Sequence, residues 1–269
     1  MNDVTHDEIH QAVRERYGRI AADGGCGCGP ACCGEPTEPG LAGGADVLAH
    51  GLGYSAVDTA AVPEGANLGL GCGNPQAIAA LRPGETVLDL GSGAGFDCFL
   101  AARQVGDGGR VIGVDMTPEM VSKARANAVK GGYGQVEFRL GEIEYLPLAD
   151  GSVDVILSNC VINLSPDKPR VFAEAFRVLR PGGRLAISDI VATADLPEAV
   201  RADLALYTGC MAGAAGIAGL EAMLARAGFR AIRIAPKDES RAFIRDWAPD
   251  TPITDYVVSA TIEAVKPLD

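Results

Sequence analysis

Apolar residues follow strand-like and helix-like patterns in alternation from Glu85 onward. Short apolar runs rich in β-branched residues predict buried strands in TVLDLG, RVIGVDM, QVEFRLG, SVDVILSN and GRLAISDIV. Apolar residues at helical spacing predict helices over Phe96–Gln104, Pro118–Lys130 and Lys168–Leu179. This alternation is typical of an α/β fold, in which helices cover both faces of a mainly parallel sheet.

The part of the chain before this alternation combines a helix with a segment that opposes regular structure. Thr5 and Glu8 have the spacing of a capping box, which predicts that a helix begins there. The segment Gly24–Gly44 is rich in glycine, proline and cysteine, and we expect it to be a mobile loop. Short helices and turns are expected over residues 45–75.

The last third of the chain extends the alternation. We predict a helix pair over Leu196–Ala227, a strand near Phe229–Ile234 and a final strand in DYVVSATIEAV. The predicted division of the chain is an N-terminal helix with a cysteine-rich loop, a ligand-binding α/β core, and added helices with terminal strands that complete the sheet, at residues 1–75, 76–195 and 196–269.

Charge and composition exclude several classes of partner. With 23 basic and 35 acidic residues, the net charge is −12, which disfavours binding to nucleic acid or to an anionic membrane surface. The uncharged run Leu204–Leu220 is interrupted by glycines and is too weakly apolar for a membrane span, so we expect a buried helix and turn. No signal peptide is visible. We therefore expect a cytoplasmic protein whose eight cysteines serve chemistry or metal binding rather than disulfides.

A glycine-rich turn, VLDLGSGAGFD, follows the first predicted strand. Its residues that we expect to face a ligand are Gly91, Ser92, Gly93 and Gly95. Glycine lets the backbone turn tightly and approach a ligand closely. The third glycine comes one position early for a dinucleotide motif, and the Asp89 carboxylate would repel a pyrophosphate but suit a cationic group. Asp115 ends the second strand, where a carboxylate can accept hydrogen bonds from ribose hydroxyls.

The glycine turn, the acidic residue of the next strand and LRPGGRL occur together and in order. In this combination they resemble the S-adenosylmethionine site of class I methyltransferases. The resemblance implies a Rossmann-like sheet with Asp89, the turn and Asp115 around the cofactor. It also implies contacts of the adenine with Met116 and with the turn Gly141, Glu142 and Ile143, while Asn159 faces the methionine end.

Cysteines occupy positions where the acceptor of a methyl group is expected. Cys72 stands before the first predicted strand, Cys160 follows the fourth, and Cys210 lies in the uncharged run. Strand ends are where α/β folds hold their ligands, which favours a functional role for Cys160. Cys98, inside the first helix of the alternation, is expected to be inert, because a buried free cysteine packs as a small hydrophobe.

No histidine or lysine presents itself as a catalytic base. All three histidines precede the cofactor turn. His6 and His10 are four residues apart on the first helix, but no third metal ligand stands close to them in the sequence, so we expect two solvated side chains. An acceptor that needs no deprotonation would fit this lack of a base.

Several longer motifs make the resemblance more specific. GANLGLGCGNP, DLGSGAGFDCF, SNCVINLSPDK and ISDIVA with the later GC resemble the arsenite methyltransferases that use S-adenosylmethionine. The resemblance implies methylation of arsenite for arsenic detoxification, with Cys72, Cys160 and Cys210 as the ligands of arsenic. Trivalent arsenic is soft and prefers thiolates, and its lone pair can attack a sulfonium methyl group without loss of a proton.

The resemblance further implies a fourth, N-terminal cysteine that takes part in a thiol–disulfide cycle. The loop offers Cys26, Cys28, Cys32 and Cys33, and we favour Cys32 or Cys33 because they lie nearest Cys72 in the chain. A structural zinc site made of all four is an alternative, although their spacing lacks the usual pairs of zinc ligands. The implied reductant is thioredoxin or glutathione, and we expect a monomer.

Two other functions stay open at this point. A carbon methyltransferase of the quinone or sterol type would have an apolar pocket and incidental cysteines. A metalloid-binding protein without turnover would keep both the fold and the thiols. No basic helix-turn-helix is visible, which weakens a sensor that acts through DNA.

Overall fold

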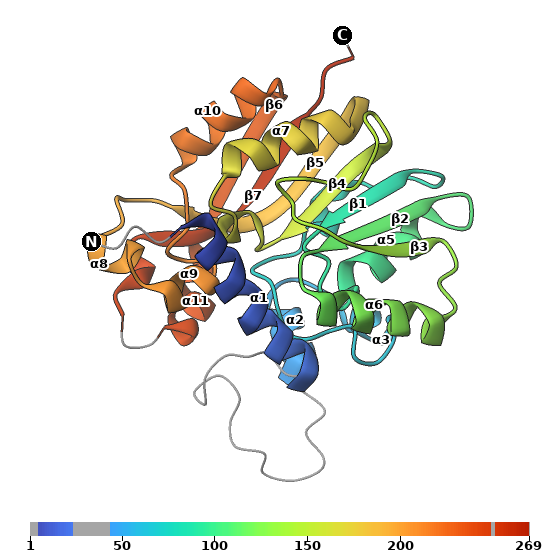
Figure 1. The fold of residues 1–269 in the computed structure, drawn as a ribbon, viewed down its shortest axis with the longest axis horizontal. Coiled ribbons are helices and arrows are strands. Elements are labelled where there is room, and N and C mark those ends of the chain that lie inside the picture. The colour runs from blue at the N-terminus through green and yellow to red at the C-terminus, as the bar shows by residue number, and fades with distance from the viewer. Residues whose placement is uncertain (1–4, 24–43, 249–250, 269) are drawn as a thin grey trace.

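The computed structural model describes residues 5–23, 44–248 and 251–268, and a seven-stranded sheet runs through this part of the chain (Figure 1). The strand order is β3-β2-β1-β4-β5-β7-β6. β1 to β5 pair in parallel, whereas β7 is antiparallel to both β5 and β6. The strands are β1 Thr86–Leu90, β2 Arg110–Asp115, β3 Val136–Leu140, β4 Val153–Asn159, β5 Leu179–Ala192, β6 Arg230–Lys237 and β7 Val257–Val265. The predicted α/β fold with a mainly parallel, Rossmann-like sheet is confirmed.

Helices cover both faces of this sheet because its strands alternate buried apolar side chains between the two faces. Val87 packs toward α5 and α6, and the next residue, Leu88, packs toward α7 and α10. The helices on the first face are α4 Gln76–Ala79, α5 Phe96–Val105 and α6 Pro118–Gly131, and those on the second face are α7 Lys168–Val178 and α10 Ile217–Ala227.

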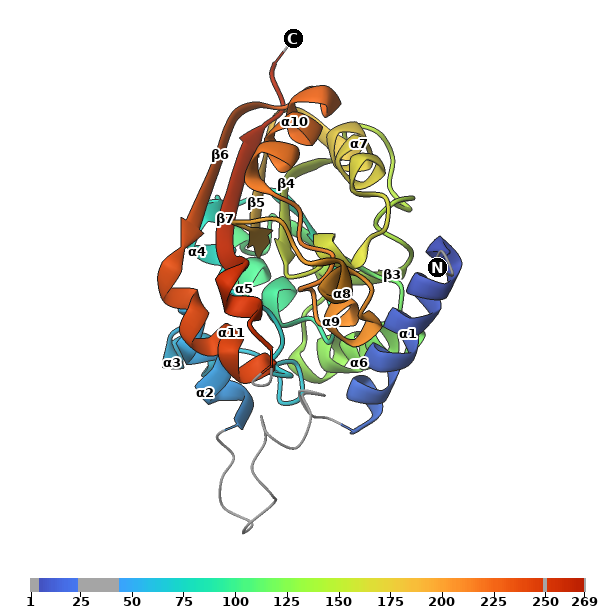
Figure 2. The same ribbon diagram turned by 90° about the vertical axis from the view of Figure 1, so that its left-hand side faces the viewer.

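The N-terminal helix α1, His6–Asp23, begins with the predicted capping box. The backbone N–H of Thr5 donates to the Glu8 carboxylate (2.7 Å), and the backbone N–H of Glu8 donates to the Thr5 hydroxyl (3.3 Å). α1 lies against α6 and α9 (Figures 1 and 2), so it crosses in front of the ends of the parallel strands. The short helices α2, Gly44–Gly51, and α3, Ala56–Ala60, follow.

The predicted helix pair over Leu196–Ala227 is wrong, because this segment forms three helices. They are α8 Glu198–Arg201, α9 Leu204–Thr208 and α10. Asp203 begins a new helix because its carboxylate accepts hydrogen bonds from the backbone N–H groups of Ala205 (2.8 Å) and Leu206 (3.0 Å). Before α10 the chain turns at Gly213, where a Cβ atom would lie 2.2 Å from the carbonyl oxygen of Asn163.

The remaining elements close the end of the sheet near β7. α11, Arg241–Trp247, packs against β7 and lies below it in Figure 2. β5 begins at Leu179, earlier than predicted, because Leu179 pairs with Val153 before a register shift in the sheet. Over the described ranges, no helix combines the length and the apolar character that a bilayer crossing requires.

Candidate active site

The glycine-rich turn joins β1 to α5 through three residues in the left-handed region. Gly91, Gly93 and Gly95 have φ values of +69°, +51° and +97°. Space also requires glycine, since a Cβ on Gly91 would lie 2.4 Å from Cγ2 of Val161. The N–H of Gly93 donates to Oδ2 of Asp115 (2.9 Å), which ties the turn to the end of β2. The turn is therefore fixed by its own conformation and by the neighbouring strand.

A cavity of about 390 Å³ opens beside this turn. Most residues predicted to bind the cofactor line it, namely Asp89, Gly91, Ser92, Gly93, Asp115, Met116, Gly141, Ile143 and Asn159. Two predicted residues do not line it. Gly95 caps the start of α5, and Glu142 lies toward α1, where Arg14 donates to it (2.5 Å).

The side chain of Ser92 lies against β2. Its hydroxyl is buried, and it has no hydrogen-bond partner among the described residues. A Cβ atom on Gly113 of β2 would lie 2.6 Å from this oxygen, so the close packing of Ser92 against the strand requires glycine there.

Two buried carboxylates, Asp89 and Asp97, face the same cavity. The Tyr54 hydroxyl donates to Oδ1 of Asp97 (2.9 Å), and the Cys98 thiol donates to Oδ2 of Asp89 (3.3 Å). Burial raises the pKa of both carboxyl groups, and the charge of Asp97 raises that of Asp89 further. A cationic group bound between them would remove this repulsion, as the ammonium of S-adenosylmethionine can. Cys98 is fully buried as predicted, but its thiol is hydrogen-bonded rather than only packed.

Asn159 connects this end of the cavity to the loop that carries Cys72. Its Nδ2 donates to the carbonyl of Gly73 (2.8 Å) and to the Tyr54 hydroxyl (3.0 Å). Its Oδ1 accepts from the backbone N–H of Cys72 (3.0 Å). The amide therefore sets where the Cys72 loop lies relative to the cofactor side of the cavity.

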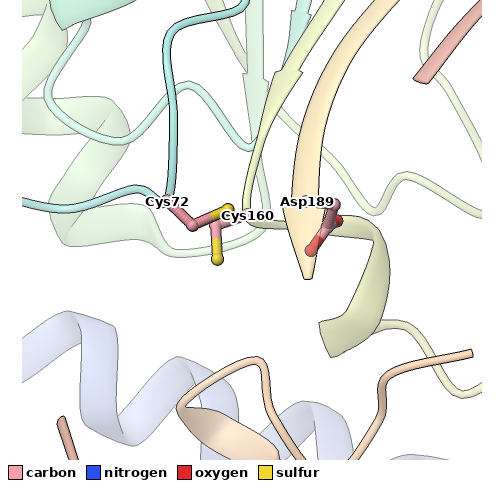
Figure 3. Close-up of side chains that lie close together, drawn as sticks. All are labelled: Cys72, Cys160 and Asp189. Atoms are coloured by element: carbon pink, nitrogen blue, oxygen red, sulfur yellow. The ribbon is translucent and has the colours of Figure 1, made fainter. Parts of the chain in front are cut away.

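The structure brings the predicted cysteines Cys72, Cys160 and Cys210 together from three separate segments. The sulfur atoms of Cys72 and Cys160 and a carboxylate oxygen of Asp189 all lie within 4.8 Å of one another. Figure 3 shows the two cysteines side by side, with Asp189 facing them from β5. Cys210 joins from the turn after α9, where its thiol donates to the carbonyl oxygen of Cys160 (2.6 Å). Cys160 and Cys210 are among the residues that line the cavity, and Cys72 is not.

Two of the three cysteines are held in a backbone conformation that disfavours them. The φ values of Cys160 and Cys210 are +60° and +66°. Each such residue other than glycine costs about 1–2 kcal/mol. The surrounding structure enforces the conformation at Cys160, whose N–H donates to the carbonyl of Ser188 (2.8 Å). Strain of this kind is typical of functional positions.

The three thiols are buried, and their environment favours the protonated form. Burial raises the pKa of Cys72. A hydrogen bond with Cys210 lowers the pKa of Cys160, but a hydrogen bond with Cys72 and burial raise it well above its usual value. Hydrogen bonding with Cys160 and burial likewise raise the pKa of Cys210. The site is therefore a cluster of neutral thiols in the free protein.

Several residues at the site were not predicted from the sequence. Asp189 is the clearest case, and an acidic residue within the otherwise apolar run of the fifth strand was a usable signal. Asp97 is the last residue of VLDLGSGAGFD, two positions after Gly95, and was equally visible. Nothing in the sequence pointed to Tyr54 or Tyr17. Tyr17 lines the cavity from α1 and is hydrogen-bonded to Cys210.

The prediction that His6 and His10 are both solvated is wrong for His10. The His10 side chain is 13% exposed, lies 3.2 Å from Oε1 of Glu144 through Nε2, and lines the cavity. The Glu144 carboxylate also accepts from the Ser165 hydroxyl. The folding of α1 across the strand ends brings His10 to the site, although it precedes the cofactor turn by many residues in the sequence. His6 is exposed.

The four cysteines of the N-terminal loop cannot be placed by this structure. The predicted mobile loop, and with it Cys26, Cys28, Cys32 and Cys33, lies outside the described residues. The choice of Cys32 or Cys33 as the fourth functional cysteine, and the alternative of a zinc site, stay predictions.

Comparison with known proteins supplies independent information on this site. Residues 81–228 match the family model of a methyltransferase domain. The chain is 58% identical over 270 residues to an arsenite methyltransferase of Halobacterium salinarum, covering 97% of this chain and 67% of that protein. It is 40% identical over 228 residues to an arsenite methyltransferase of Aquipseudomonas alcaligenes, covering 82% of this chain and 62% of that protein. The chain thus spans roughly two thirds of the length of these relatives.

A solved structure gives the same picture at the level of the fold. The crystal structure of an arsenic(III) S-adenosylmethionine methyltransferase from Chlamydomonas reinhardtii superimposes with a TM-score of 0.60. Sequence identity is 36%, and the match covers 82% of this chain and 72% of that chain.

Proposed function

The chain belongs to the family of S-adenosylmethionine-dependent arsenite methyltransferases, and from this premise we propose that it transfers a methyl group from S-adenosylmethionine to trivalent arsenic. The observation that carries the proposal is the meeting of Cys72, Cys160 and Cys210 at the end of β4, beside the cavity. Soft trivalent arsenic prefers thiolate ligands over the oxygen ligands of harder ions.

Bound S-adenosylmethionine supplies an electrophilic methyl group on a sulfonium sulfur. Asp89 and Asp97 would hold the cationic amino-acid end, whose charge would offset the repulsion between the two buried carboxylates. Asp115, which lines the cavity at the end of β2, would accept hydrogen bonds from the ribose. The remaining contacts in this assignment are those of the other cavity-lining residues that the sequence predicted, Gly91, Ser92, Gly93, Met116, Gly141, Ile143 and Asn159.

The protonated thiols suit arsenous acid, which is neutral at pH 7. Each thiol that binds forms an As–S bond and breaks an As–O bond, and its proton leaves with the hydroxide as water. No separate base is needed for this exchange, and none is needed in the transfer itself. S-adenosylmethionine would supply the methyl group with its sulfur as the leaving group, and arsenic held by Cys72, Cys160 and Cys210 would accept that methyl group on its lone pair. Holding both reactants in one cavity is then the main catalytic contribution of the protein.

The same proposal assigns a role to each of the three segments of the chain. Residues 76–195 bind the cofactor, residues 196–269 add the Cys210 segment, and residues 1–75 add Cys72 and the N-terminal cysteine, Cys32 or Cys33. That cysteine takes part in the thiol–disulfide cycle that returns arsenic to the trivalent state, with electrons from thioredoxin or glutathione. The protein acts in the cytoplasm as a monomer.

One assay tests this proposal directly. The purified protein is mixed with methyl-labelled S-adenosylmethionine, arsenite and a reducing thiol, and the arsenic species are separated. Label in methylated arsenic is the expected result. Cofactor binding without any labelled arsenic would overturn the acceptor, and arsenite binding measured in the same preparation would then separate a metalloid-binding protein from a methyltransferase of another substrate.

A further inference from the structure

The preformed cluster at the site has a donor set that differs from the one arsenic needs. Two sulfurs, from Cys72 and Cys160, and one carboxylate oxygen, from Asp189, lie within 4.8 Å of one another. All three residues are buried, with relative exposures of 1%, 8% and 2%. The third thiol, of Cys210, lies beside this group, where it donates to the carbonyl oxygen of Cys160 (2.6 Å) and is hydrogen-bonded to the Cys160 thiol. The atoms that lie within 4.8 Å of one another are therefore two sulfurs and one oxygen (Figure 3), with the Cys210 thiol next to them.

Hydrogen bonds fix the Asp189 carboxylate and leave one of its acceptor positions available. Its Oδ1 accepts from Nδ2 of Asn163 (2.9 Å) and from the N–H of Ile190 (2.7 Å), and its Oδ2 accepts from the N–H of Ile162 (2.8 Å). A carboxylate offers about four acceptor positions, so one position on Oδ2 stays available. Three hydrogen bonds from the surrounding chain orient this oxygen in the way that outer contacts orient the ligands of metal sites.

We propose that this cluster binds a borderline divalent cation, such as Zn²⁺, in competition with arsenite. Zinc takes thiolate sulfur and carboxylate oxygen together and prefers four ligands, so Cys72, Cys160 and Asp189 supply three and either Cys210 or water supplies the fourth. Both thiols give up their protons to solvent when the cation binds. Trivalent arsenic uses thiolates, so the carboxylate distinguishes the two occupants.

The experiment measures zinc binding without cofactor or arsenic. The full chain carries serine in place of Cys26, Cys28, Cys32 and Cys33, so that zinc bound at the N-terminal cysteines does not contribute to the measurement. Competition with a chromogenic zinc chelator is expected to show one bound Zn²⁺ per chain. Asp189→Asn is expected to weaken this binding by about tenfold or more. The matched control, Cys98→Ser, alters another buried thiol outside the cluster and is expected to leave zinc affinity unchanged.

Arsenite binding supplies the contrast within the same variants. Trp247, the single tryptophan, lines the cavity, so its fluorescence is the signal used to measure arsenite binding. We expect Asp189→Asn to change arsenite affinity by less than about threefold while it weakens zinc binding. Equal zinc affinity with and without the carboxylate, or no bound zinc in the parent, would overturn the proposal.

A spectroscopic measurement covers the case in which Asp189→Asn does not fold. Co²⁺ in the parent is expected to give thiolate-to-cobalt charge-transfer absorption and the visible bands of a tetrahedral site. Both are expected to disappear in Cys160→Ser. Their absence from the parent would contradict the proposal without any need for the Asp189 variant.

The regulatory consequence rests on the proposed methylation of arsenite. Zinc is expected to raise the KM for arsenite and to leave kcat unchanged, and a fall in kcat alone would contradict a shared site. Methylation in chelator-treated buffer tests the proposed function separately. Turnover without zinc binding would overturn only the zinc site, and zinc binding without turnover would overturn only the methylation.

Discussion

The cavity has two sides that are built in different ways. On the side of β1 and β2, the ligand-facing chain is a turn whose conformation suits its residues, since Gly91 and Gly93 occupy positive φ without strain. On the side of β4 and β5, Cys160 and Cys210 occupy equally positive φ with side chains that disfavour it. The first side is a backbone cradle specified locally. The second is an assembly of remote side chains that only the folded structure holds in place.

The difference indicates whether the backbone or the side chains carry the function of each side. The backbone cradle requires positions without side chains, because a side chain on Gly91 would meet Val161. The thiol side needs the side chains themselves and accepts strained backbone at two of them. Changes at the cradle are therefore expected to act on folding and cofactor binding, and changes at the thiols on chemistry.

The loss of a thiol is expected to have the largest effect, which is on the rate of arsenite methylation. Cys160→Ser replaces the sulfur at the centre of the cluster by an oxygen that arsenic binds poorly, so arsenite methylation is expected to fall by about 10³-fold or more. Cofactor affinity is expected to stay within about twofold, because the cradle is untouched. Labelled-methyl transfer and calorimetric cofactor binding measure the two quantities.

Cys98→Ser is the matched control for this change. It alters a buried thiol of α5 and keeps a donor for Asp89. Methylation by Cys160→Ser at a rate close to that of Cys98→Ser would contradict the ligand set.

The next largest effect is expected on the free energy of unfolding when a glycine of the cradle is replaced by alanine. Gly91→Ala meets both a positive φ and an atom of Val161 at 2.4 Å, so unfolding free energy is expected to fall by about 3 kcal/mol. Gly93→Ala meets the same strain but no atom within 4 Å, so a loss of about 1 kcal/mol is expected. Urea denaturation measures both. Equal losses would show that the close approach to Val161 has no energetic weight.

The same contrast explains what could be predicted from the sequence. The strands, the sheet and the residues of the cradle follow from local patterns, because apolar periodicity and glycine positions report backbone structure directly. Asp189, Tyr54 and His10 gain their roles only through contacts between segments far apart in the chain. The single Asp203 cap divided a helix pair into three helices, which shows how one hydrogen-bonding side chain overrides apolar spacing.

An intermediate effect is expected at the junction of the two sides. Tyr54→Phe removes a hydroxyl that donates to Asp97 (2.9 Å) and accepts from Asn159 (3.0 Å). Asp97 then keeps fewer partners, so we expect cofactor affinity to fall by about tenfold, equivalent to ~1.4 kcal/mol. Calorimetry measures this affinity. Unchanged affinity would remove Asp97 from the cofactor side.

The smallest effect tests the strain at the thiols. Cys210 has a φ of +66°, which glycine adopts freely and alanine does not. Cys210→Gly is therefore expected to be more stable than Cys210→Ala by about 0.5–1 kcal/mol, after the greater freedom of glycine in the unfolded chain is subtracted. The same pair of changes at Cys98, inside α5, is expected to have the opposite sign, because glycine in a helix costs about 1 kcal/mol relative to alanine. Urea denaturation of the four variants measures the two differences. The same sign at both positions would show that the backbone at Cys210 carries no strain, and the thiol side would then differ from the cradle only in its side chains.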